Sequence, residues 1–235
     1  MPLADGPQRS GAPPRAKCIL AFDTSGPWCT AVLSTGADTT LRRHVDMARG
    51  QAEALVPMLD ALLRDTGLGW KDLDAVAVGI GPGNFTGIRI AVATARGLAL
   101  GLGIPGIGVS LFEVLAAQHA PARRVLCSVE APREGACVQI VDRGTPQGAP
   151  HLIDLSAPPS EPVAPVVIGH RAADIAKALG AQAIEAVPQD LAAQIALIAA
   201  QRLRAGVGLR DCPAPLYVRP ADAAPPRAAP VPILP

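Results

Sequence analysis

The sequence is poor in aromatic residues and has almost no net charge. Its 235 residues include three Phe, two Trp and one Tyr, and 21 basic residues face 20 acidic ones, for a net charge of +1. Because 49% of the residues are apolar, a sizeable core must be built from Ala, Val, Leu and Ile, in one large or two small domains. A balanced charge creates no long-range field toward nucleic acid or an anionic membrane. This excludes functions that depend on an overall basic charge.

Long apolar runs, paired cysteines and a secretory start are also missing. No apolar run approaches the ~18 residues that span a bilayer. Residues 1–15 contain four prolines and no apolar stretch, so we expect a disordered leader there rather than a signal peptide. The five cysteines form no CxxC pair, and most lie in apolar, strand-like runs. This pattern predicts core cysteines without a disulfide framework, in a cytoplasmic protein.

Patterns for metal binding and nucleophilic catalysis are absent as well. The four histidines form neither an HxxH nor an HxxxH pair; they are His44, His119, His151 and His170. No GxSxG motif occurs, and no cysteine has an evident activating neighbour. We therefore expect no metal site and no catalytic residue in this chain.

The first half of the chain alternates between strand and helix patterns. We expect strands at Lys17–Asp23, Trp28–Ser34, Thr39–Val45, Ala75–Gly79 and Ile104–Val109, and helices at Gln51–Thr66, Phe85–Leu102 and Leu111–His119. This βββαβαβα order predicts an α/β fold with a mixed sheet, in which an antiparallel meander is extended by right-handed parallel crossovers. Pro57 lies inside the first helix pattern, so that helix either starts late or bends there.

The second half has a weaker pattern. We expect strands at Val125–Glu130, Ala136–Asp142, near Leu152 and at Val166–Ile168, and helices at Arg171–Leu179 and Gln189–Ala205. Eight prolines among the last 23 residues predict a disordered end. The expected organisation is a leader at 1–15, a first lobe at 16–120, a second lobe at 121–212 and a Pro/Ala-rich tail at 213–235.

The most distinctive stretch is the glycine-rich loop at 79–83, between a predicted strand and the predicted helix at 85–102. Its glycines permit positive φ angles or close approach of another group. Asn84 or Thr86 can cap the helix, whose N-terminal N–H groups favour an anion. The loop has no Walker lysine, so a phosphate site is one interpretation and a sharp strand-to-helix turn is the other.

A second candidate site is Asp23-Thr24-Ser25, at the end of the first predicted strand. A carboxylate and hydroxyl groups at this edge of a sheet could hold a magnesium–phosphate group. An Asx or Ser turn that closes a hairpin explains the same residues. Both interpretations stay open.

Two predicted helices carry residues suited to helix packing. Small residues recur every fourth position from Gly87 through Ala91 and Ala95, which lets another helix approach closely. The earlier helix has an apolar leucine stripe. Both features are compatible with packing on the chain's own sheet or with half of a helical bundle shared with a partner. For a partner interface we predict Leu55, Leu59, Leu62, Gly87, Ala91 and Ala95.

Several blocks of this sequence resemble the TsaB family, the dimerisation subunit of the bacterial machinery that makes N6-threonylcarbamoyladenosine in tRNA. The blocks are ILAFDTS at 19–25, GIGPGNFTGIR at 79–89, GLALG at 97–101 and IGVS at 107–110. The resemblance covers roughly 19–120 and thins beyond it to 130–133 and 215–219. Two departures occur: Gln51 stands where the family often has histidine, and Glu130-Ala131-Pro132 where it usually has Asp-Ala-Arg.

The resemblance implies an actin-like, sugar-kinase-like ATPase fold of the ribonuclease H type, with two lobes and an abbreviated second lobe. It implies a TsaD-type partner that carries the metal-binding histidines and the catalytic site, and a TsaE-type ATPase in the same assembly. ATP and magnesium would be used by the complex and not bound tightly by this chain. tRNA would be reached only through the complex, the chain alone could form a homodimer, and no membrane is involved.

The function implied is that of a non-catalytic scaffold for threonylcarbamoyl transfer to the N6 of the adenosine next to the anticodon. Its nucleotide site would be vestigial and would comprise Asp23, Thr24, Ser25, Gly81, Gly83 and Asn84. The alternative is a small-molecule kinase of the same fold that uses Asp23 and the Gly79–Gly83 loop around ATP. A metallopeptidase, a label sometimes attached to relatives, is disfavoured because the sequence lacks a histidine pair.

Overall fold

The computed structural model describes residues 16–35, 38–120, 123–131, 135–156, 164–209 and 211–218. The chain divides into two compact units, one made of 1–109 and 189–214 and the other of 110–188 and 215–235. The predicted leader at 1–15 and most of the predicted tail, 219–235, lie outside the described residues.

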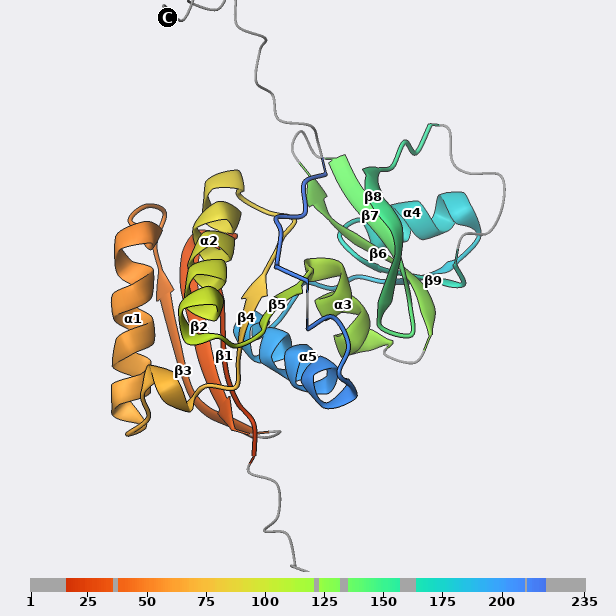
Figure 1. Cartoon of the computed structure of the whole chain (residues 1–235). Coiled ribbons are helices and arrows are strands. Elements are labelled where there is room, and N and C mark those ends of the chain that lie inside the picture. The colour runs from red at the N-terminus through yellow and green to blue at the C-terminus, as the bar shows by residue number, and fades with distance from the viewer. Residues whose placement is uncertain are drawn as a thin grey trace, which may run out of the picture. The chain divides into compact units, whose positions relative to one another are not determined.

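Unit 1 is built on a five-stranded mixed sheet with the strand order β3-β2-β1-β4-β5 (Figure 1). The strands are β1 (Cys18–Asp23), β2 (Trp28–Thr35), β3 (Asp38–Asp46), β4 (Ala75–Gly79) and β5 (Gly106–Val109). The first three form an antiparallel meander, and β4 and β5 extend it in parallel from β1. The predicted mixed sheet is confirmed, with the meander and the parallel crossovers in the expected order.

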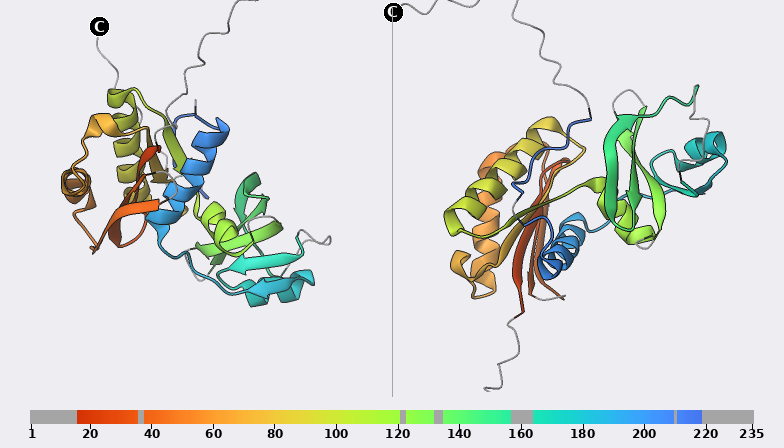
Figure 2. Two further views of the ribbon diagram at one scale, coloured as in Figure 1. Left: turned by 90° about the horizontal axis from the view of Figure 1, so that it is seen from below. Right: turned by 45° about the vertical axis from the view of Figure 1, so that its right-hand side comes forward.

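Helices cover both faces of this sheet. Helices α1 (Gln51–Asp65) and α2 (Phe85–Leu102) lie on one face, and α5 (Leu191–Ala205) lies on the other (Figure 2, right). A short 3-10 helix, η1 (Trp70–Asp72), precedes β4. Every residue of β1 and β4 is buried, because a strand covered on both faces needs apolar side chains on both of them.

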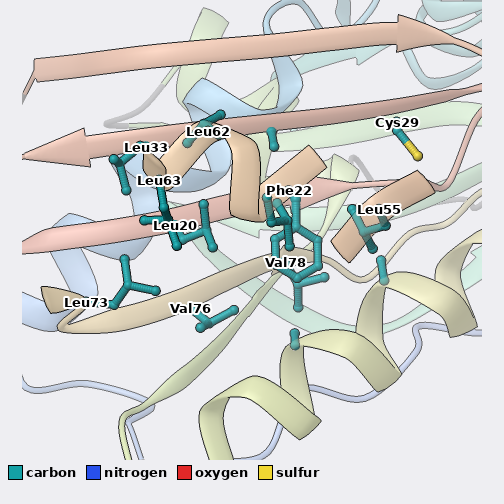
Figure 3. Close-up of a cluster of buried hydrophobic side chains, with 14 of the residues drawn as sticks. Leu20, Phe22, Cys29, Leu33, Leu55, Leu62, Leu63, Leu73, Val76 and Val78 are labelled. Atoms are coloured by element: carbon teal, nitrogen blue, oxygen red, sulfur yellow. The ribbon is translucent and has the colours of Figure 1, made fainter. Parts of the chain in front are cut away.

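The buried core between the sheet and the α1–α2 layer is aliphatic apart from Phe22 and two cysteines, Cys18 and Cys29. Figure 3 shows Leu20 and Phe22 of β1 and Val78 of β4 meeting Leu55 and Leu62 of α1. Helix α1 begins at Gln51, as predicted, and continues through Pro57 to Asp65. Pro57 lies on the exposed side of the helix. Because proline has no N–H, the carbonyl one turn earlier lacks its usual donor, and water can hydrogen-bond to it there.

The residues predicted to contact a partner lie in this core. Five of them are 0% exposed and Gly87 is also buried; the full set is Leu55, Leu59, Leu62, Gly87, Ala91 and Ala95. Their spacing of three or four residues places them on the sides of α1 and α2 that face β1 and β4. The interface prediction is therefore corrected: these side chains hold unit 1 together and are not available to a partner.

Helix α2 also bears on the expectation that no apolar run of this chain is long enough to span a bilayer. It has 18 residues with a mean hydropathy of 1.3, so by length and composition alone it is long and apolar enough to cross a membrane. In unit 1 it packs on β4, β1 and β5. Only 28% of it is buried, so much of an apolar helix lies on the surface of the unit.

Unit 2 contains a second five-stranded sheet, with the order β10-β9-β6-β7-β8. The strands are β6 (Arg124–Ala131), β7 (Gly135–Asp142), β8 (Thr145–Leu152), β9 (Val166–Gly169) and β10 (Gln182–Ile184). Strands β6, β7 and β8 form an antiparallel meander, and β9 and β10 extend it in parallel from β6. Unit 2 thus repeats the strand topology of unit 1, which is the duplication expected of two related lobes.

In the part of unit 2 that the structure describes, α3 (Leu111–His119) and α4 (Ala172–Leu179) cover the sheet. Helix α3 buries Phe112 and Leu115 against β6, β7 and β9, and α4 buries Ile175 against Leu126 and Val167. Strand β10 was not predicted, because its three residues are exposed and carry no alternation.

Two helices belong to a different unit from the lobe in which they were predicted. Helix α3 follows β5 in the chain but belongs to unit 2, and α5 follows β10 but packs on β1 and β2 of unit 1. The predicted boundaries at 120 and 212 therefore differ from the units, which change at 109/110, 188/189 and 214/215. Residues 213–218 were predicted to be tail, yet Pro213 packs beside Gly106 and Gly108 in unit 1. Leu216 and Val218 pack on the core of unit 2.

Candidate functional site

The ends of β1 and β4 bring most of the predicted nucleotide-site residues together. Phe22 and Val78 are paired in the parallel register, so Asp23 and Gly79 end their strands side by side at one edge of the sheet of unit 1. The backbone N–H of Asn84 donates to the carbonyl of Ser25 at 2.7 Å. Ser25 therefore contacts both Gly83 and Asn84. Thr24 instead contacts Gly87, and Gly81 packs against Ile88 of α2.

Asp23 is completely buried, and its two carboxylate oxygens have different surroundings. Oδ1 accepts hydrogen bonds from the backbone N–H of Ser25 at 2.9 Å, from Ser25 Oγ at 2.9 Å and from Trp28 Nε1 at 3.0 Å. Oδ2 has no hydrogen-bond partner in the described part of the chain. It points at Gly79, where an added Cβ would lie 2.0 Å away. Burial raises the pKa of this carboxyl group.

Hydrogen bonds connect the turn after β1 to the start of α2. Thr24 Oγ1 donates to the carbonyl of Gly87 at 2.6 Å. Asn84 is the N-cap of α2, and its Oδ1 accepts from the N–H of Gly87 at 2.9 Å. A Cβ at Gly87 would lie 1.9 Å from the carbonyl oxygen of Thr24, so only glycine permits this contact. Of the two predicted caps, Asn84 is confirmed.

These contacts engage the N–H and hydroxyl groups of Ser25 and the N–H groups of Asn84 and Gly87 within the chain. The bond from the Ser25 N–H to the Asp23 side chain, two residues back, is an Asx turn, which confirms the turn interpretation of the Asp23-Thr24-Ser25 segment. The ring of Trp28 packs against the backbone of the turn at Gly26, where an added Cβ would lie 2.2 Å from the ring. Sequence reasoning missed Trp28; its position directly after the Gly-Pro turn was the available signal.

We expect Asp23→Asn to raise the free energy of unfolding at pH 7–8 by on the order of 1 kcal/mol. Because the folded-state pKa of Asp23 is raised, protonation favours the folded state. That contribution is fully present below the unfolded pKa of ~3.9 and is lost as pH rises through the folded pKa. Asparagine accepts the same hydrogen bonds at Oδ1 without a buried charge.

Urea unfolding of both proteins between pH 4 and pH 8 checks this. The advantage of Asp23→Asn over the wild type should grow with pH. A variant less stable than the wild type at pH 8 would contradict it and would mean that the ionised carboxylate is stabilised in the fold. Asp23→Ala is the comparison that removes the hydrogen bonds as well.

A second candidate surface is the outer face of α1 and α2, on the side away from the sheet. Leu100 is 86% exposed and Val56 is 43% exposed, and Ala93 and Gly97 lie exposed beside Leu100 on α2. An added Cβ at Gly97 would meet no atom within 4 Å. We call these four residues, Val56, Ala93, Gly97 and Leu100, the outer face.

At the N-terminal end of α2, Phe85 is 44% exposed, and the guanidinium of Arg89 stacks on its ring at 3.8 Å from the centroid. The outer face was not predicted from the sequence, because small residues recur at every fourth position on two different sides of α2. Ala91 and Ala95 mark the buried side, and Ala93 and Gly97 mark the exposed one.

The sequence departs from the TsaB pattern at Gln51 and at residues 130–132. Gln51, the first residue of α1, donates from Nε2 to the carbonyl of Met47 at 3.1 Å, which fixes the entry of the chain into the helix. Glu130 is exposed near the end of β6. Pro132 is outside the described part of the chain.

Comparison with known proteins gives one family and a consistent fold. The family model of TsaD, described as tRNA N6-adenosine threonylcarbamoyltransferase, matches residues 45–139, which is less than half of the chain. No curated protein matches the sequence.

Two solved structures from Pseudomonas aeruginosa are similar to this chain. One is YeaZ, at 25% identity and a TM-score of 0.63, covering 86% of this chain and 99% of that one. The other is an uncharacterised protein with similarity to peptidase YeaZ, at 24% identity and a TM-score of 0.64, covering 86% of this chain and 100% of that one.

These similarities agree with the duplicated strand topology, and the chain has the actin-like, sugar-kinase-like ATPase fold that was predicted. YeaZ is another name for TsaB. The matching TsaD-type segment runs from β3 to β7 and includes the glycine-rich loop and α2. The chain is thus similar to TsaD-type proteins over residues 45–139 and to the YeaZ structures over most of its length.

Proposed function

We propose that this chain is a non-catalytic scaffold subunit of a tRNA threonylcarbamoyladenosine transferase, and that it acts by binding a TsaD-type catalytic subunit. In that complex it supports threonylcarbamoyl transfer to the N6 of the adenosine next to the anticodon. The observation that carries the proposal is the outer face of α1 and α2, an exposed apolar surface on a chain that is similar to the YeaZ structures and to TsaD-type proteins.

The outer face has the properties of a helix-packing surface. Val56 of α1 and Leu100 of α2 are large apolar side chains that the fold leaves exposed. Near Leu100, Ala93 and Gly97 leave the α2 backbone accessible, so a partner helix can approach closely. Because α1 and α2 lie side by side on one face of the sheet, two partner helices would complete a four-helix bundle. In the absence of the partner, a second copy of the chain offers the same surface, so a homodimer is expected.

The site at the end of β1 supports the non-catalytic part of the proposal. The carboxylate of Asp23 is buried, and the donors around it are already paired within the chain. A nucleotide phosphate would have to displace the Asx turn and the Trp28 ring to reach it. ATP and magnesium are therefore assigned to the assembled complex, with its TsaE-type ATPase, and tRNA is reached through that complex.

Magnesium–ATP titration of the isolated chain separates this proposal from a small-molecule kinase that uses Asp23 and the Gly79–Gly83 loop. We expect no measurable binding heat by isothermal calorimetry at millimolar ATP and no ATP hydrolysis above the buffer rate. Tight, magnesium-dependent binding that disappears in Asp23→Ala would favour the kinase instead. Asp23→Asn is the matched control, because it keeps the hydrogen bonds of the turn while removing the charge.

A further inference from the structure

The position of the outer face depends on how α2 is held in unit 1. Every residue of α2 is described, and none after Ala95 is buried. The buried residues are Gly87, Ile88, Ala91, Val92 and Ala95. Three of them are glycine or alanine, so the packed side of the helix is smooth. Because large side chains form the ridges that fix a packing angle, these small residues leave the angle of α2 to be set by other contacts.

The start of α2 is joined to the end of β1 by two hydrogen bonds and two close backbone contacts. Thr24 Oγ1 donates to the carbonyl of Gly87 at 2.6 Å, and the N–H of Asn84 donates to the carbonyl of Ser25 at 2.7 Å. An added Cβ would lie 1.9 Å from the Thr24 carbonyl oxygen at Gly87, and 2.7 Å from the Ser25 carbonyl oxygen at Gly83. We call these five residues the α2 anchor.

The α2 anchor lies at one end of the helix, and the outer-face residues of α2 lie further along it. With the rise of an α-helix, Leu100 is about 20 Å from Gly87 along the axis, so a turn of about 10° at Gly87 would move Leu100 by about 3 Å. A binding surface needs its groups within roughly 0.5 Å and 10–20° of the productive geometry. A small change at the α2 anchor is therefore large enough to disturb the outer face.

We propose that the α2 anchor is a positioning device for the partner surface, in which the Thr24 hydroxyl group holds α2 at the angle that the TsaD-type subunit binds. This inference rests on the proposed function, because it takes the outer face as the surface that binds this subunit. Thr24 is 0% exposed, so it acts through Gly87 and the helix and not by touching the partner. The polar turn at the end of β1 then serves assembly.

The test compares Thr24→Val with Thr24→Ser. Valine keeps the branched shape of threonine without its hydroxyl group, whereas serine keeps the hydroxyl group. Gly83→Ala is a second variant that alters the α2 anchor, because its added Cβ would press on the carbonyl oxygen of Ser25. Gly83 is exposed, so this change removes nothing from the core, and it carries the test if Thr24→Val does not fold.

Val32→Ala is the matched control for a general loss of stability. Val32 is 2% exposed on β2, and its neighbours Ala31 and Leu33 belong to the core under α1 and α2. Since side chains alternate along a strand, Val32 faces the other side of the sheet. Its truncation therefore lowers the stability of unit 1 without changing the α2 anchor.

Affinity for the TsaD-type subunit is measured by isothermal calorimetry, at a temperature at which circular dichroism shows the proteins folded. We expect Thr24→Val and Gly83→Ala to bind at least about tenfold more weakly than the wild type. Thr24→Ser and Val32→Ala should match the wild type. Wild-type affinity in both Thr24→Val and Gly83→Ala would overturn the proposal. So would an equal loss of affinity in Val32→Ala, since binding would then follow stability alone.

If the wild-type chain does not bind a TsaD-type subunit, the proposed function has failed, and the α2 anchor is tested on the isolated chain. Hydrogen–deuterium exchange of the α2 amides then reports how firmly the helix is held. Faster exchange across α2 in Thr24→Val, but not in Thr24→Ser or Val32→Ala, supports the hold of the anchor on the helix. The same exchange in Thr24→Val and the wild type rejects it.

Discussion

Ala95→Glu is expected to unfold the isolated chain. Ala95 is 0% exposed and belongs to the core between α2 and the sheet of unit 1. A glutamate there must either bury an unpaired carboxylate or force α2 off β4, and either outcome costs at least ~3 kcal/mol. Since a domain of this kind is stable by only about 5–15 kcal/mol, a large drop in melting temperature by circular dichroism is the expected result.

The matched control is Ala93→Glu, two residues earlier on the same helix. Ala93 is exposed, so its substitution should leave the melting temperature within about 2–4 °C of the wild type. An Ala95→Glu protein that melts like Ala93→Glu would contradict the buried position of Ala95. It would also restore Ala95 as a candidate interface residue.

Gly97→Glu is expected to abolish assembly with the TsaD-type subunit while leaving the isolated chain folded. An added side chain at Gly97 meets no atom within 4 Å in this chain, and replacing glycine inside a helix stabilises the helix by roughly 0.5–1 kcal/mol. On the proposed bundle, however, the new charge would lie where two helix backbones approach closely and would be buried without a partner. Affinity should fall by at least about a hundredfold, the equivalent of ~3 kcal/mol.

Gly97→Ala is the control for Gly97→Glu, because it gives the same gain in helix propensity and keeps the surface smooth. We expect Gly97→Ala to assemble like the wild type in analytical ultracentrifugation and to melt at the same temperature or higher. Normal assembly by Gly97→Glu would remove α2 from the interface. Loss of assembly by Gly97→Ala as well would contradict the result expected for this control.

Much of the fold was predictable because its signals are local. Helices α2 and α3 have the bounds that were predicted, Phe85–Leu102 and Leu111–His119, since a glycine-rich turn or a serine cap precedes each helix and a change of pattern follows it. The order of elements indicated the meander with parallel crossovers.

The contacts that decide function were less predictable because they depend on tertiary packing. Helix α2 carries small residues on two sides, and only the folded structure shows that Ala95 faces β4 whereas Gly97 faces outward. In the same way, the pattern of α5 shows an apolar stripe without showing which sheet it covers, so its place in unit 1 was missed.

The partial success at Asp23 has a similar cause. The Asx turn is local, so an acidic residue followed by hydroxyl side chains predicted it. The third donor, the indole N–H of Trp28, lies across the hairpin on β2, and the packing against Gly79 comes from the parallel pairing of β1 with β4. Long-range pairing of this kind buries Asp23, which its local sequence does not reveal.

Reconstituted modification of an unmodified tRNA tests the central claim most directly. The TsaD-type subunit, the TsaE-type ATPase, a threonylcarbamoyl donor, magnesium and ATP are combined with and without this chain, and N6-threonylcarbamoyladenosine is measured by mass spectrometry of the digested tRNA. The account predicts product only when the chain is present, with none from the chain and tRNA alone. Equal product without the chain, or product from the chain without the TsaD-type subunit, would contradict it.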